Sequence, residues 1–110
     1  GSLVYGQRVK VKTLTASRRI NELGNFPDVV AARALMEMGA EPVTGYRADV
    51  QVDIVYLDVR DMIVGNVEVF EGDRRVSAFT VKAEFGKNRG SGSELIRVVE
   101  QVTAEAIHRL

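Results

Sequence analysis

The stretch RADVQVDIVYLDV, residues 47–59, decides the fold. From residue 48 onward, apolar side chains occupy every second position, and the positions between them begin as polar ones. This period of two predicts a β-strand with one buried and one wet face. At Val55, Leu57 and Val59 the polar positions also become apolar, so the end of the strand is apolar on both faces. Three explanations stay open: a β-bulge that changes the register, cover by residues 15–24, or cover by a partner chain.

Similar patterns on either side of this strand predict the other elements. Alternating residues predict strands over 7–14, 62–70 and 75–85, with turns at 60–61 and 71–74. Pro27 and Asp28 start a helix that runs to about Met38, where Gly39 supplies a left-handed stop. Apolar residues at helical spacing predict a last helix from near Glu94 to the end of the chain. Residues 15–24 are polar and predict a long loop, with Ile20 and Leu23 as its anchors to the core.

The predicted order β-α-β-β-β-α belongs to the α+β class. We expect a two-layer sandwich, in which a mostly antiparallel four-stranded sheet carries both helices on one face. The first strand joins the second through a helix, so these two strands should be parallel. The other face of the sheet is then open. We predict one domain over residues 3–110, and we expect Gly1 and Ser2 to be the remnant of a cleaved affinity tag.

Composition narrows the possible functions. The 110 residues include 15 basic and 15 acidic side chains, so no overall charge favours nucleic acid or an anionic membrane. With no cysteine and one histidine, the chain cannot build a thiol nucleophile, a disulfide or a structural zinc site by itself. No apolar stretch reaches the length of a transmembrane helix. We therefore predict no enzyme, no cofactor and no metal site.

The basic residues offer one alternative site. The loop of residues 86–93 holds three glycines and leads into a helix amino terminus, where an anion is favoured. It lacks the spacing of a Walker or a dinucleotide motif. Arg74, Arg75, Lys87 and Arg89 are the candidates for anion or nucleic-acid binding. The carboxylates of Asp49 and Asp53 and the side chain of His108 are better explained as solvated surface groups than as a catalytic set.

One part of the chain resembles a known group of proteins. The helix end ALMEMGAEPV (34–43) leads through a glycine into YRADVQVDI (46–54), a strand that opens with Ala-Asp and alternating valines. This order is similar to the small α/β domains of bacterial envelope lipoproteins, the broad group of the TolB amino-terminal domain, CsgG and the penicillin-binding-protein activator lipoproteins. The lipid-anchored cysteine of such proteins is not in this sequence. The resemblance implies assembly and protein contact without catalysis.

The expected function follows from these observations. The chain is predicted to be a non-enzymatic interaction or assembly domain of the bacterial cell envelope, periplasmic or associated with the outer membrane. Its partner is expected to be another protein or further copies of itself, bound through Val55, Leu57 and Val59. The alternative is a cytoplasmic domain that binds nucleic acid or anions through the four basic residues.

Overall fold

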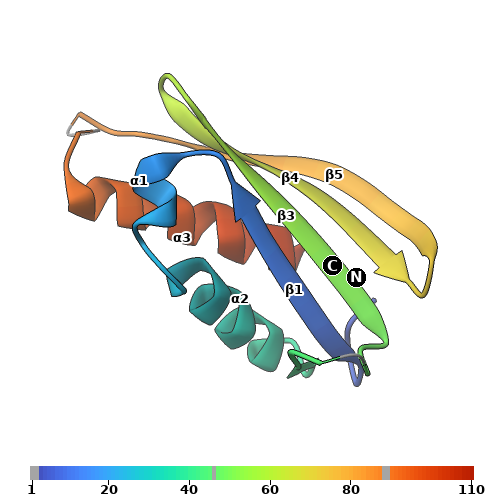
Figure 1. Cartoon of the computed structure of the whole chain (residues 1–110). Coiled ribbons are helices and arrows are strands. Elements are labelled where there is room, and N and C mark those ends of the chain that lie inside the picture. Colours follow the sequence, from blue (N-terminus) through green and yellow to red (C-terminus); the bar gives the residue numbers. More distant parts are fainter. Residues whose placement is uncertain (1–2, 46, 88–89) are drawn as a thin grey trace.

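The elements follow the predicted hydrophobic patterns, with two additions. The structure is a computed structural model that describes residues 3–45, 47–87 and 90–110. Within those residues the chain forms five strands and three helices (Figure 1). In chain order these are β1 (Arg8–Thr15), α1 (Arg18–Asn21), α2 (Phe26–Glu37), β2 (Glu41–Pro42), β3 (Val50–Val59), β4 (Met62–Glu71), β5 (Arg74–Glu84) and α3 (Gly92–His108).

The sheet is mixed, which corrects the predicted mostly antiparallel four-stranded sheet. Its five strands, all in the described part of the chain, lie in the order β2-β1-β3-β4-β5. β1 is parallel to both β2 and β3, as the crossover through α2 requires for β3. β3, β4 and β5 form an antiparallel meander. The class α+β and the two layers are as predicted.

Both long helices cover the same face of the sheet, so the core lies between the two layers. α2 and α3 contact each other, and α3 packs on β4 and β5. The inward side chains of β3 are at most 2 % exposed. In the middle of this core the Tyr56 hydroxyl lies 2.5 Å from Thr103 Oγ1. The Thr103 hydroxyl in turn donates to the Val99 carbonyl at 2.8 Å. Each buried polar atom of this pair therefore has a partner.

The segment after β1 contains a short helix, which corrects the predicted loop over residues 15–24. Ser17 caps α1, its hydroxyl accepting a hydrogen bond from the Ile20 amide at 3.3 Å. Ile20 is 2 % exposed and Leu23 packs on the core, so both predicted anchors are confirmed. A single turn of helix is too short to show a hydrophobic period. The two anchor residues alone therefore could not predict that this segment is helical.

The second addition is β2, which pairs beside β1 through only two residues. The Glu41 amide donates to the Gln7 carbonyl at 2.8 Å, and the Val43 amide donates to the Val9 carbonyl at 2.9 Å. Pro42 lies between these two donors, so its missing N–H faces away from β1. A proline is tolerated in this position of an edge strand.

Candidate functional site

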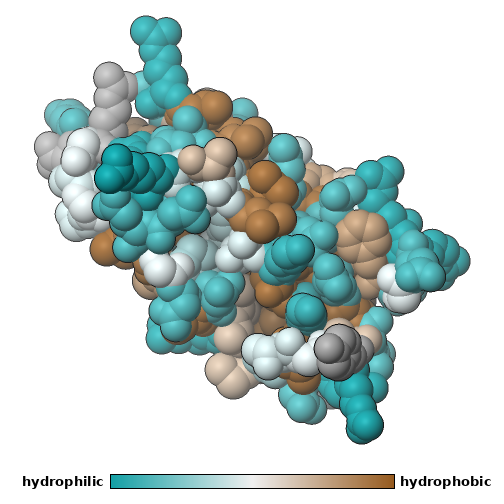
Figure 2. Space-filling view, viewed as in Figure 1, coloured by the Kyte–Doolittle hydropathy of each residue, from teal (hydrophilic) through white to brown (hydrophobic). Residues whose placement is uncertain are grey.

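Six apolar side chains form a patch on the open face of the sheet. The register places Leu14 beside Val55, Leu57 opposite Val64 and Val59 opposite Met62, with both members of each pair on the face away from the helices. We call these residues the open-face patch: Leu14, Val55, Leu57, Val59, Met62 and Val64. Figure 2 shows hydrophobic atoms gathered where β1, β3 and β4 run side by side, with hydrophilic side chains around them.

The patch is uncovered in the single chain. Leu14 is 45 % exposed, and Leu57 and Val59 are each 42 % exposed. The pairing of β3 with β4 runs in one register from Gln51 to Val59, so no bulge explains the apolar end of β3. In an antiparallel pair of strands with one solvent-exposed face, apolar and polar residues should alternate along each strand. Here the solvent-exposed face is apolar over several neighbouring positions. Patches of this kind mark interaction sites on folded proteins.

Residues 15–24 do not cover the patch, because their polar contacts lie on the other face of β3. Asp58, which has the opposite parity to Leu57, accepts from Arg19 Nε at 2.7 Å, from Arg19 Nη2 at 2.9 Å and from the Ser17 hydroxyl at 2.9 Å. The Arg19 guanidinium holds the pKa of Asp58 below its usual value. Arg19 also stacks on Phe85, 4.9 Å from the ring centre. These contacts hold the end of β3 from the side opposite to the patch and leave the open face of the strand uncovered.

Charged side chains of both signs surround the patch. In the sheet register, Lys82 is the neighbour of Val64 and Glu84 is the neighbour of Met62. On the other side Lys12 lies next to Asp53, directly beside the Leu14–Val55 pair. A polar rim around an apolar centre is the usual anatomy of a protein–protein interface.

The predicted basic residues lie at different places in the fold. Arg74 and Arg75 stand at the turn between β4 and β5, where Arg74 pairs with Glu71 at 3.5 Å and Arg75 with Glu68 at 2.9 Å. Arg74 and Arg75 are the first two residues of β5 and Lys87 follows its last residue, Glu84, so the length of the strand separates them, roughly 35 Å of extended chain. Arg89 lies outside the described residues. Arg74 and Arg75 are therefore far from Lys87, and both arginines are paired with a glutamate.

The acidic residues and the histidine also have structural partners. Arg8 holds Asp49 through bonds of 3.0 and 3.3 Å, which lower the pKa of that carboxyl. Asp53 Oδ1 accepts from the side-chain nitrogen of Gln51, Nε2, at 2.9 Å. His108 Nε2 lies 3.8 Å from the carboxylate of Glu37. No group of three or more side chains suited to a metal ion occurs among the described residues.

Sequence reasoning missed part of this surface. It identified Val55, Leu57 and Val59, but not Leu14, Met62 or Val64, which complete the patch from the neighbouring strands. The signal for Leu14 was present, because it has the same parity as Lys10 and Lys12 and so ends the wet face of β1 with an apolar residue. Val64 has the parity opposite to that of the buried Ile63, Val67 and Val69, which indicates the open face, but its position opposite Leu57 depends on the register between β4 and β3.

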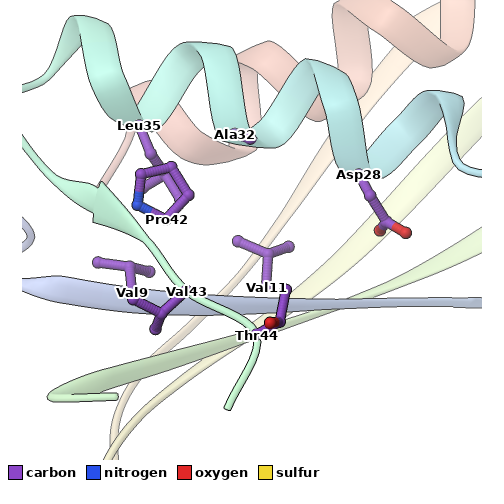
Figure 3. A pocket seen from close by; sticks show the side chains of 8 residues that line it. All are labelled: Val9, Val11, Asp28, Ala32, Leu35, Pro42, Val43 and Thr44. Atoms are coloured by element: carbon purple, nitrogen blue, oxygen red, sulfur yellow. The ribbon is translucent and has the colours of Figure 1, made fainter. Parts of the chain in front are cut away.

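A groove beside α2 was missed altogether. Its volume is about 180 Å³, and it lies between α2, the outer edge of β1 and the segment that contains β2 (Figure 3). Its walls are mostly apolar, and the carboxylate of Asp28 stands at one end. No pattern in the sequence indicated it, because β2 has only two residues.

Comparison with known proteins gives matches in structure only. No protein-family model matches the chain, and no curated protein matches it. The PelC dodecamer from Paraburkholderia phytofirmans matches with a TM-score of 0.71 and 12 % identity over 97 % of this chain and 89 % of that one. A Xanthomonas campestris protein of the DUF330 family matches with a TM-score of 0.64 and 12 % identity, over 99 % and 85 % of the two chains.

A third structure is a lipoprotein. GNA1162 from Neisseria meningitidis matches with a TM-score of 0.58 and 12 % identity, over 94 % of this chain and 98 % of its own. At these identities the likeness establishes the fold alone. It agrees with the broad resemblance to bacterial lipoprotein domains, whereas the narrower likeness to the TolB amino-terminal domain and CsgG stays a prediction. In the part of the chain that the structure describes, no helix has the length and apolar character to cross a membrane.

Proposed function

We propose that this chain is a non-enzymatic assembly domain of the bacterial cell envelope, which binds further copies of itself through the open-face patch. The observation that carries the proposal is the exposure of Leu57 and Val59, at 42 % each, within a continuous group of apolar side chains. Such a group gains free energy when a partner removes it from water, at about 25 cal/mol per Å² of apolar surface.

The structural neighbours support the same role. The PelC structure is a dodecamer, and the Neisseria protein is a lipoprotein. These likenesses support a proposed location in the periplasm or at the outer membrane and a homo-oligomer as the proposed state. A cytoplasmic role in anion or nucleic-acid binding has less support, because Arg74 and Arg75 lie far from Lys87 and are already paired.

The test replaces one residue of the patch. Leu57→Asp places a carboxylate in the proposed interface, where burying a leucine is worth about 2 kcal/mol and an unpaired charge costs more. We expect the dissociation constant of the oligomer to rise at least about tenfold. Light scattering after gel filtration measures the mass of the particle at several concentrations.

The matched control is Ile96→Asp. Ile96 in α3 has the same 42 % exposure as Leu57 but lies outside the patch. We expect this variant to assemble as the unchanged chain does. Equal masses for the unchanged chain and a folded Leu57→Asp variant would contradict the proposal.

A further inference from the structure

The two edges of the sheet are treated differently by the rest of the chain. On β5, the carbonyl of Glu84 accepts from Arg97 Nη2 at 3.1 Å and the carbonyl of Thr80 accepts from Arg109 Nη1 at 3.4 Å. Both arginines come from the region of α3. Side chains that occupy outward-facing backbone groups hinder the addition of another strand. The β5 edge is therefore partly blocked.

The β1 edge is open in its middle. Val9 and Gln7 bond to the β2 segment through their carbonyls, so odd-numbered residues of β1 direct their backbone groups to this edge. At the far end, the carbonyl of Thr15 accepts from Asn21 Nδ2 at 3.1 Å. Between these points Val11 and Thr13 have no strand partner on this side among the described residues. Their backbone N–H and C=O groups are therefore available to hydrogen-bond with an additional strand.

The groove borders this open length on the helix side. Val11 points from β1 towards α2, and the groove is closed at one end by the β2 segment (Figure 3). An added strand would place every second side chain in this groove. Its apolar lining favours apolar side chains there, and it consists of Val9, Val11, Ala32, Leu35, Pro42 and Val43.

Two lysines of β1 determine which residues would suit the other face of an added strand. Lys10 and Lys12 belong to β1 but have the opposite parity to Val11, so they lie on the open face beside the same edge. Neither lysine has an ion-pair partner among the described residues. Acidic side chains on the alternate positions of an added strand would lie next to them, as favourable cross-strand neighbours.

We propose that the β1 edge binds an extended segment of a partner protein as an additional strand, with apolar residues in the groove and acidic residues beside Lys10 and Lys12. The backbone of Val11 and Thr13 provides the hydrogen bonds of this β-addition. The inference goes beyond the oligomeric role and does not rest on it, because the open-face patch is formed by other residues.

The test uses a peptide of alternating glutamate and valine, blocked at both ends, added to the full chain at up to 1 mM. Hydrogen exchange followed by NMR should show the amides of Val11 and Thr13 protected at least tenfold. A peptide of alternating lysine and valine is the control and should protect them much less. Equal protection by both peptides, or none by either at 1 mM, overturns the proposal.

Two variants fix the location of the binding. Val11→Pro removes one outward-facing donor without breaking a bond to β3, and Ala32→Phe fills the groove from α2. Each should weaken binding of the acidic peptide at least tenfold. The matched control is Lys82→Pro in β5, whose N–H also faces outward, and it should bind as the unchanged chain does. Unchanged binding by both groove variants, or protection of Val11 and Thr13 by self-association before peptide is added, contradicts a partner segment at this edge.

Discussion

At the scale of single residues, the closest approach between the layers depends on a glycine. A Cβ atom added to Gly65 of β4 would lie 2.8 Å from Val102 Cγ1 and 3.2 Å from Val81 Cγ2. Gly65 is also the register partner of Tyr56, the largest of the fully buried side chains. The absence of a side chain at this position lets α3 pack directly on the sheet.

We predict that Gly65→Ala destabilises the fold. The added methyl group must displace Val102 in a filled core, and overpacking of this kind costs about 1–3 kcal/mol. Urea denaturation measures the free energy of unfolding. Gly45→Ala is the control, since a Cβ atom there has no neighbour within 4 Å. A Gly65→Ala variant as stable as the unchanged chain would show that α3 is not held this close.

At the scale of elements, the start of α3 combines a side-chain cap with a contact to the end of β5. The hydroxyl of Ser91 accepts a hydrogen bond from the Glu94 backbone amide at 3.2 Å and so caps the helix. The carboxylate of Glu94 does not complete a capping box. It accepts from the backbone amide of Gly86 and from Arg97, at 2.7 Å from Nε, and so joins the end of β5 to the helix.

The charge of Glu94 makes this junction sensitive to strong acid. Arg97, and then the Gly86 amide, lower the pKa of Glu94 from 4.5 to about 2. Because the folded-state pKa is depressed, the contact contributes fully above pH 4.5 and is lost as the pH falls through about 2. An NMR titration should give a midpoint near 2 for both the Glu94 carboxyl carbon and the Gly86 amide. Arg97→Gln should move this midpoint upward. A midpoint near 4.5 in the unchanged chain would disprove the contact.

The sequence predicted elements that have a hydrophobic period, and only those. β3 and α3 repeat their patterns over ten or more residues, and their predicted inward residues are buried. α1 and β2 have four and two residues, too few for a period. β2 depends on pairing with residues of β1 that are distant in sequence, and the α1 segment is held by contacts of Ser17 and Arg19 with the distant Asp58. Because β2 was not predicted, the groove beside it was not predicted either, and the sheet was expected to be mostly antiparallel.

The candidate site was predicted in part for the same reason. The apolar end of β3 is visible as a break in alternation within one strand. Its completion by Leu14, Met62 and Val64 requires the register between strands, which is set in the folded sheet. The predicted group of basic residues shows the converse, because Arg75 and Lys87 are close in sequence but are held apart by an extended strand, which begins at Arg74 and ends before Lys87.

At the scale of the whole molecule, the two proposed binding surfaces lie on different parts of the sheet. The open-face patch belongs to β1, β3 and β4, whereas the groove lies on the helix side of the β1 edge. The β5 edge carries arginines of the α3 region on two of its carbonyls. The two proposals are therefore compatible, because association through the open face would leave the β1 edge free for an added strand.

Burial of the open-face patch in the assembled, unchanged protein is the central claim, and methyl NMR measures it directly. The chain is labelled at leucine, valine and isoleucine methyl groups, and a soluble paramagnetic agent relaxes the methyl groups that it can reach. At a concentration where the oligomer dominates, we expect that Leu57 and Val59 are protected while Ile96, equally exposed in the single chain, is relaxed. Equal relaxation of Leu57 and Ile96 at that concentration would contradict the account.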